Sequence, residues 1–294
     1  MLLISFSADG TTRIGALDRD HGQVIDFSRT SPELPAEMAA FIGLGPAGLE
    51  AARRAVAGGT GRLPLEEVAL LAPIPRPPRN IFCVGKNYRD HVQEVRAIAT
   101  RGDGHGLPEV PIFFTKATSA VIGPGQPIPA RLDPTDTTDY EGELAVVIGV
   151  GGRGISAADA WDHIYGFTIV NDATSRALQF RHQQWFLGKS LDGFCPMGPA
   201  ILTADEVEDV TALRVQTRVN GELRQDGGLD QLIFDVPTLV QSLAAAMTLE
   251  AGDVIATGTP AGVGMGFEPP RYLRGGDEVA ITIEPIGTLR NPVE

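Results

Sequence analysis

The feature that most constrains the fold is a pair of glutamates at the start of an apolar run. Residues 139–148 read DYEGELAVVI, and the β-branched end of that run predicts a strand. Alternate side chains of a strand share a face, so Glu141 and Glu143 should point the same way, with Cα atoms about 7 Å apart. Two neighbouring carboxylates repel each other. Such a pair is tolerable if it is solvated, if one member is protonated, or if a cation lies between them.

A third carboxylate follows the next apolar run. Residues 164–170 read IYGFTIV and predict a second strand, which is followed by Asn171 and Asp172. If the two strands are neighbours, Asp172 lies at the same end of the sheet as the two glutamates. Three hard oxygen ligands with no Cys or His nearby suit Mg²⁺ or Mn²⁺ better than zinc. The plainer alternative, which an isolated Glu-x-Glu pattern favours, is the solvated face of a half-exposed strand.

Five motifs taken together resemble the fumarylacetoacetate hydrolase family. They are DYEGEL at 139–144, NDATSR at 171–176, GKS at 188–190, TGTP at 257–260 and GTLRN at 287–291. The motifs occur in the order found in that family and at about its spacing. The combination is specific although no single motif is, and the resemblance extends from about Pro73 to the C-terminus.

The resemblance implies an α+β, β-rich fold whose large catalytic domain is a mixed β-roll or sandwich. Short strands, few long helices and dense Gly and Pro punctuation independently argue against a doubly wound parallel sheet. Residues 71–78 read LAPIPRPP and contain four prolines, which cannot continue a helix or a central strand. We therefore expect a small N-terminal α+β domain at residues 1–72, acting as a structural cap, and the catalytic domain at residues 73–294.

The resemblance also implies that Glu141, Glu143 and Asp172 hold the divalent ion. Mg²⁺ or Mn²⁺ is the expected cofactor, and Ca²⁺ is an acceptable substitute for either in crystals. From the charges alone, we expect that only a divalent ion makes the convergence of these three carboxylates tolerable.

A candidate general base lies upstream of the carboxylates. If the segment after Lys86 becomes helical, His91 and Glu94 lie on one face. A carboxylate hydrogen-bonded to imidazole fixes its tautomer, although a His-x-x-Glu pair by itself is usually only a surface contact. The match to the lid segment of the family favours a catalytic dyad. Residues 101–108 are predicted to be a loop that lets this segment close over a ligand, with a plain surface loop as the alternative.

Three polar residues complete the expected site. Residues 174–186 have helical character, and Gln179 matches a glutamine that reaches the substrate carboxylate in the family; an exposed helix glutamine is the alternative. Lys189 matches the active-site lysine of the family, and would pair with the carboxylates or with the keto oxygen of the substrate. Thr259 matches a threonine that holds a substrate carboxylate. Its loop lacks the spacing of nucleotide-binding motifs, which argues against a nucleotide.

The activity implied by the resemblance is that of a divalent-metal-dependent enzyme acting on a small anionic 2-oxo or 2,4-dioxo acid. The main expectation is hydrolytic C–C cleavage of an acylpyruvate-type substrate through a metal-stabilised enolate. The alternatives are isomerisation of a hydroxymuconate-like diacid such as 2-hydroxyhepta-2,4-dienedioate, and decarboxylation or tautomerisation of a β-keto diacid such as oxaloacetate. An alternative of another class is a catalytically silent metal-binding homologue.

Composition narrows the choice of partners. The 24 Lys and Arg residues against 37 Asp and Glu give a formal charge of −13, which repels nucleic acid and anionic membranes. No apolar run approaches the ~20 residues that span a bilayer, and the N-terminus lacks the basic region of a secretion signal. We therefore expect a cytoplasmic protein, and the resemblance implies a homodimer. Cys83 and Cys195 are predicted to be small buried hydrophobes rather than a disulfide or zinc ligands.

Overall fold

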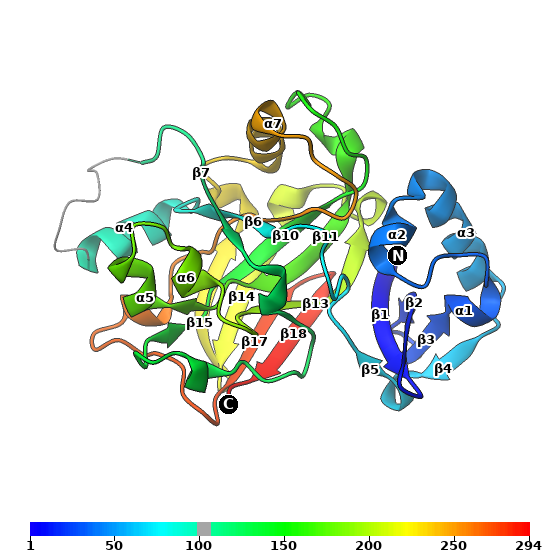
Figure 1. Cartoon of the computed structure of the whole chain (residues 1–294), viewed down its shortest axis with the longest axis horizontal. Helices are drawn as coiled ribbons and strands as arrows, with labels where there is room; N and C mark the ends of the chain where they lie inside the picture. Colours follow the sequence, from blue (N-terminus) through cyan, green and yellow to red (C-terminus); the bar gives the residue numbers. More distant parts are fainter. Residues whose placement is uncertain (99–106) are drawn as a thin grey trace.

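The fold is built on two sheets, as seen in the computed structural model, which describes residues 1–98 and 107–294 (Figure 1). A twelve-stranded mixed sheet runs in the order β4-β3-β2-β1-β13-β11-β10-β16-β6-β7, with β5 paired to β1 and β8 to β13. A four-stranded sheet has the order β15-β14-β17-β18, and β9 pairs with β12. This strand-rich α+β architecture agrees with the predicted fold class.

The bounds of the elements are as follows. The long sheet contains β1 (Leu2–Ala8), β2 (Thr11–Asp18), β3 (Gln23–Asp26), β4 (Arg62–Pro64), β5 (Ala69–Leu70), β6 (Ile81–Gly85), β7 (Ile112–Lys116), β8 (Val121–Ile122), β10 (Gly142–Ile148), β11 (Ile164–Asn171), β13 (Cys195–Thr203) and β16 (Val254–Ala256). The remaining strands are β9 (Thr138–Asp139), β12 (Thr174–Ser175), β14 (Arg214–Val219), β15 (Glu222–Gly228), β17 (Glu278–Ile283) and β18 (Gly287–Pro292). The helices are α1 (Phe27–Thr30), α2 (Met38–Ile42), α3 (Gly45–Ala57), α4 (Arg89–Ile98), α5 (Arg176–Arg181), α6 (Phe186–Lys189) and α7 (Val236–Ala246).

The N-terminal strands and helices gather at one end of the molecule, and α4, α5 and α6 lie at the other (Figure 1). The N-terminal part is joined to the rest through the long sheet, because β1 pairs antiparallel with β13 and places Leu3 opposite Ile201. The division into domains at residues 72 and 73 stays a prediction. The loop predicted at residues 101–108 lies almost wholly outside the described residues, so its proposed closing role also stays a prediction.

The two acid-bearing segments are neighbours in the middle of the long sheet, as predicted. Strands β10 and β11 pair antiparallel, with Glu143 opposite Val170, and the backbone N–H of Asp172 donates to the carbonyl of Glu141 at 2.8 Å. Every residue of both strands is buried. When both faces of a sheet are covered, the sequence of each strand is continuously apolar rather than alternating between apolar and polar residues. The alternative of a half-exposed strand with a solvated carboxylate face is therefore wrong.

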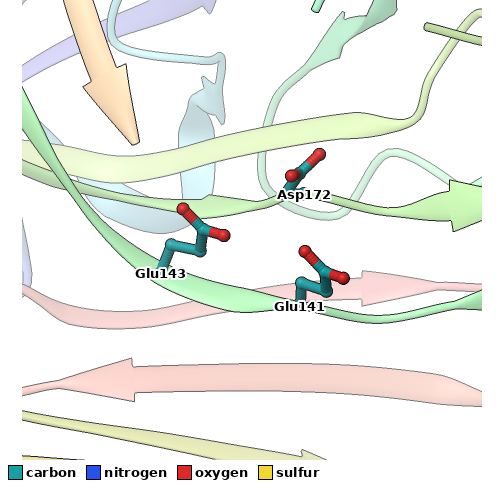
Figure 2. Close-up of side chains that lie close together, drawn as sticks. All are labelled: Glu141, Glu143 and Asp172. Atoms are coloured by element: carbon teal, nitrogen blue, oxygen red, sulfur yellow. The ribbon is translucent and has the colours of Figure 1, made fainter. Parts of the chain in front are cut away.

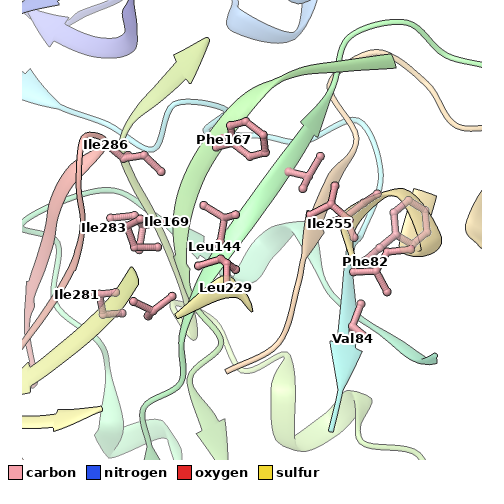
Figure 3. Close-up of a cluster of buried hydrophobic side chains, with 14 of the residues drawn as sticks. Phe82, Val84, Leu144, Phe167, Ile169, Leu229, Ile255, Ile281, Ile283 and Ile286 are labelled. Carbon is pink, nitrogen blue, oxygen red and sulfur yellow. The ribbon is translucent and has the colours of Figure 1, made fainter. Parts of the chain in front are cut away.

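The apolar core lies between the sheets and on both sides of β10 and β11. Leu144, Phe167 and Ile169 from the long sheet belong to the same buried cluster as Ile281 and Ile283 of β17 (Figure 3). The two cysteines are free and fully buried, as predicted. In the described part of the chain, no helix is long and apolar enough to span a bilayer.

The expected helical stretch at 174–186 needs a correction, because it is broken into two short helices. Helix α5 ends at Arg181, His182 has an extended backbone, and the chain becomes helical again at Phe186. The two helices fold against each other so closely that a Cβ on Gly188 would lie 2.5 Å from the backbone nitrogen of Gln179. One continuous helix could not bring these two positions together.

Candidate active site

Three carboxylates converge at the ends of β10 and β11 (Figure 2). Glu141 immediately precedes β10, Glu143 lies within it and Asp172 follows β11. One oxygen from each residue can be chosen so that all three lie within 4.8 Å of one another, and the side chains are buried. A divalent ion ligated at about 2.0–2.6 Å can bridge oxygens at such separations. The residues therefore fit a hard dication such as Mg²⁺, Mn²⁺ or Ca²⁺.

Two buried lysines already compensate these carboxylates. The Lys189 ammonium donates to Glu141 Oε2 at 2.8 Å and to Asp172 Oδ2 at 2.7 Å. The Lys116 ammonium donates to the other oxygen of Asp172, Oδ1, at 2.7 Å and to the carbonyl of Ala173 at 2.9 Å. The expectation that only a divalent ion makes the convergence tolerable is therefore wrong. The pairing of Lys189 with the carboxylates was expected from the sequence, whereas the contribution of Lys116 was not.

Arg176 is the third buried cation, and its guanidinium connects several groups. Nη1 lies 2.6 Å from Glu141 Oε1 and donates to Gln179 Oε1 at 3.1 Å, while Nε donates to Asp139 Oδ2 at 2.9 Å. The Asp139 carboxylate also accepts from the backbone N–H groups of Gly264 and Met265. Among the described residues Nη2 is buried without a hydrogen-bond partner, although Arg176 lines a cavity. A buried donor without a partner is costly, so this atom is suited to bind a ligand.

The surroundings of the two glutamates shift their pKa values in opposite directions. Burial raises the pKa of Glu143 well above its usual range, and the charges of Asp172 and Glu141 raise it further. For Glu141, burial also opposes ionisation, but Lys189 and Arg176 outweigh it and lower the pKa. The surroundings therefore favour the ionised form of Glu141 and oppose that of Glu143. A bound dication would favour the ionised form of Glu143, because a metal takes the deprotonated carboxylate as its ligand.

The predicted pair of His91 and Glu94 is formed on helix α4. The ring nitrogen Nδ1 of His91 lies 3.1 Å from Glu94 Oε2. An ionised carboxylate only accepts, so Nδ1 carries the hydrogen and Nε2 keeps a lone pair. Glu94 is itself anchored, because its Oε1 accepts from the backbone N–H of Gly262 at 2.9 Å. His91 is buried and can therefore act as a base toward a group in the cavity that it lines.

A cavity of about 260 Å³ brings the predicted residues together. Its lining includes the predicted residues His91, Glu141, Glu143, Gln179, Lys189 and Thr259, together with Arg176 and the apolar Val84, Phe114, Phe180, Trp185 and Met265. A volume of this size suits a small acid rather than a cofactor or a drug-sized ligand. Asp172 and Glu94 are not part of this lining, but each contacts a residue that is, Asp172 through Lys189 and Glu94 through His91.

Gln179 and Thr259, two of the three residues predicted to bind substrate, differ in the hydrogen-bonding groups that remain free for a ligand. Gln179 uses its Oε1 to accept from Arg176, which leaves both hydrogens of its amide for a ligand. Thr259 donates its hydroxyl hydrogen to the carbonyl of Gly142 at 2.9 Å and accepts from the Gln225 amide at 2.7 Å. Its hydroxyl hydrogen is therefore already engaged, and its contact with a substrate carboxylate stays a prediction.

Sequence reasoning missed Lys116, Arg176 and Asp139 as parts of the site. Arg176 and Asp139 belong to the two acidic motifs, but their pairing across 37 positions could not be derived from either motif alone. Lys116 is the last residue of the apolar run IFFTK, and this position was the only feature of the sequence that could have indicated its role. A lysine in an apolar setting either extends to solvent or has a function, and this rule would have selected Lys116.

Comparison with known proteins agrees with this geometry. A family model described as "Fumarylacetoacetate (FAA) hydrolase C-terminal" matches residues 80–294. The oxaloacetate tautomerase YisK of Bacillus subtilis (strain 168) is 54% identical over 229 residues, which cover 78% of this chain and 74% of that protein.

Solved structures extend the similarity over the whole chain. A fumarylacetoacetate hydrolase from the psychrophilic Exiguobacterium antarcticum is 44% identical with a TM-score of 0.84, covering 100% of this chain and 99% of that chain. A maleylpyruvate hydrolase from Sphingobium sp. SYK-6, in complex with manganese (II) ion and pyruvate, is 31% identical with a TM-score of 0.80, covering 100% and 98%. From its motifs, its carboxylate cluster and these similarities together, the chain belongs to the fumarylacetoacetate hydrolase family.

Proposed function

We propose that this protein interconverts the keto and enol forms of oxaloacetate or of a closely related small 2-oxo diacid. The observation that carries the proposal is the buried imidazole of His91, which contacts Glu94 and lines the same small cavity as Glu141, Glu143 and Lys189. Further support comes from the relative with the highest identity reported above, which is an oxaloacetate tautomerase. We therefore favour tautomerisation, one of the alternatives given from the sequence, over the hydrolytic reaction that was the main expectation.

Substrate binding follows from the donors that the cavity leaves unused. Nη2 of Arg176 and the amide of Gln179 can both donate to one substrate carboxylate. Lys189 has used two of its three hydrogens on Glu141 and Asp172, and the third can donate to the 2-oxo oxygen. A dication held by Glu141, Glu143 and Asp172 would supply Lewis-acid stabilisation of negative charge on the 2-oxo acid.

The proton transfer is assigned to His91. Its Nε2 takes one of the two hydrogens from the carbon between the carbonyl and the distal carboxylate. The electron pair of that C–H bond forms the C=C bond, and the carbonyl oxygen becomes the enol oxygen. The proton on His91 or one from solvent then completes the enol. No bond between carbon atoms breaks, so water need not enter as a reactant.

Hydrolysis of an acylpyruvate is the second candidate. It is favoured by one observation, the similarity to a maleylpyruvate hydrolase solved with manganese and pyruvate. The same Nε2 of His91 would then take a proton from water rather than from carbon. The two candidates differ in their product, because only hydrolysis releases pyruvate.

The deciding experiment follows both products with one enzyme preparation. Decay of the ultraviolet absorbance of enol-rich oxaloacetate reports tautomerisation, and lactate dehydrogenase with NADH reports pyruvate released from oxaloacetate or acetylpyruvate. We expect faster enol decay without pyruvate, loss of that acceleration in EDTA and recovery with Mg²⁺ or Mn²⁺. Pyruvate release from acetylpyruvate with no acceleration of enol decay would reject the tautomerase in favour of hydrolysis.

Replacement of Gly266 by alanine should disable the dyad without disturbing the fold. The new Cβ would lie 2.1 Å from Glu94 Oε1 and 2.6 Å from its Cδ, so the flexible carboxylate must move away from His91. We expect kcat for enol decay to fall roughly 10- to 100-fold, because a misplaced base transfers protons poorly. Gly275→Ala is the control, since a Cβ there meets nothing closer than 3.7 Å. Equal activity of both variants would show that the contact with Glu94 has no role.

A further inference from the structure

Lys116 is the one buried cation of the described cluster that does not line the cavity. It ends β7, whereas Lys189 ends α6 and Arg176 begins α5. Lys116 and Asp172 are both 0% exposed, so neither side chain reaches solvent. A role in contacting substrate is therefore not available to Lys116, and its function must be exerted through Asp172.

The contacts of Lys116 fix the carboxylate of Asp172 from one side. Its ammonium holds Oδ1 at 2.7 Å, while Lys189 holds Oδ2 at 2.7 Å. The same ammonium donates to the carbonyl of Ala173 at 2.9 Å, which ties the backbone after Asp172 to β7. Lys116 thus determines both the orientation of the carboxylate and the position of the segment that carries it.

The cluster as a whole is nearly balanced in charge without an ion. Four buried carboxylates, those of Asp139, Glu141, Glu143 and Asp172, face the three cations Lys116, Arg176 and Lys189. Desolvation of a carboxylate is tolerated when buried cations with good geometry compensate it. The three cationic side chains therefore supply much of the positive charge that a dication would otherwise provide.

We infer that Lys116 is a positioning residue that keeps Asp172 in its ligand position while the site is empty of its ion. The metal-free protein then retains an assembled cluster, and an ion can leave and return without local unfolding. This inference rests on the proposed metal site. Residues that hydrogen-bond to metal ligands commonly change the affinity for the metal. A cationic residue in this position should mainly stabilise the metal-free protein.

Replacing Lys116 by methionine removes the charge and keeps a side chain of similar length. Without an ion, Oδ1 of Asp172 then has no donor and only Lys189 compensates the carboxylate. With Mn²⁺ bound, the added positive charge offsets the loss. The stability of the variant should therefore depend on the ion more strongly than that of the wild type, since a ligand stabilises in proportion to its preference for the folded state.

The experiment compares melting temperatures in EDTA and in saturating Mn²⁺, with Mn²⁺ binding measured by electron paramagnetic resonance. We expect the rise in melting temperature caused by the same Mn²⁺ concentration to be about twice as large in Lys116→Met as in the wild type, with correspondingly tighter Mn²⁺ binding, because this stabilisation grows with the affinity for the folded state. Lys116→Arg, which retains a cation, should show a rise close to that of the wild type. Ile201→Val is the control for general destabilisation, because Ile201 lies in the core on β13, away from the carboxylates.

Three results would contradict either the role inferred for Lys116 or the proposed metal site, and they distinguish between the two. An equal loss of melting temperature with and without Mn²⁺, as in Ile201→Val, would show that Lys116 only packs and would overturn the inference. A Lys116→Met protein that fails to fold even in saturating Mn²⁺ would overturn it too, because the ion should restore the lost charge. A wild type that binds no Mn²⁺ would instead reject the proposed metal site itself.

Discussion

Replacing His91 by alanine is expected to slow enol decay by about 10²–10⁴-fold, because the general base is removed from the cavity. His91 lines the cavity, whereas Glu94, whose carboxylate contacts its Nδ1, does not. The side chain contacts none of the three carboxylates through a hydrogen bond or an ion pair. Mn²⁺ binding and the melting temperature should therefore stay close to those of the wild type.

The matched control is His163→Ala, which removes an imidazole outside the cavity lining whose Nδ1 forms a hydrogen bond with the carbonyl of Val150. Stopped-flow absorbance gives kcat and KM for both variants, and electron paramagnetic resonance gives Mn²⁺ affinity. Loss of activity accompanied by loss of Mn²⁺ binding would mean that His91 supports the metal site rather than proton transfer. Activity within a factor of about two of the wild type would remove the dyad from the mechanism.

Replacing Asp172 by asparagine should have the largest effect on stability. Both carboxylate oxygens accept from lysines that are themselves buried, so asparagine turns an N–H₂ group toward one ammonium and leaves that charge unpaired. Breaking a buried ion pair from one side costs about 3–5 kcal/mol. The variant should also bind Mn²⁺ more weakly and lose enol-decay activity, since a neutral amide oxygen replaces one of three anionic ligands.

Asp226→Asn makes the same chemical change in a solvent-exposed ion pair with Arg214. Such a pair contributes about 1 kcal/mol or less, so urea unfolding should distinguish the two variants clearly. An Asp172→Asn protein as stable as Asp226→Asn would show that Lys116 and Lys189 find other partners when the carboxylate is lost. Retained Mn²⁺ affinity would show that Asp172 is not a ligand.

The predictable part of the site lies on continuous strands. Strand periodicity places Glu141 and Glu143 together, and the two apolar runs are close enough in sequence to pair, which brings Asp172 to the same end of the sheet. One helical turn joins His91 to Glu94. These contacts depend on local geometry, so residue spacing was sufficient to predict them.

Other parts of the fold could not be read in this way. The stretch after Asp172 has helical composition throughout, yet it folds back at His182 because α6 packs against α5. Strand β1 of the N-terminal segment extends the long sheet through β13, and no local pattern in the sequence indicated this pairing. Pairing between strands about two hundred residues apart is chosen by the shape of the whole molecule.

The sequence by itself determined the convergence of the three acidic residues, the contact between His91 and Glu94, the family resemblance and the strand-rich fold, because each depends on short stretches of sequence. Only the tertiary structure decided how the buried charge is balanced. Lys116 and Lys189 meet the two oxygens of Asp172 from 56 and 17 positions away, on elements that touch only after the sheet and the α5–α6 pair have formed. The interaction between two charges depends on the distance between them in the folded protein, and this distance cannot be derived from their positions in the sequence.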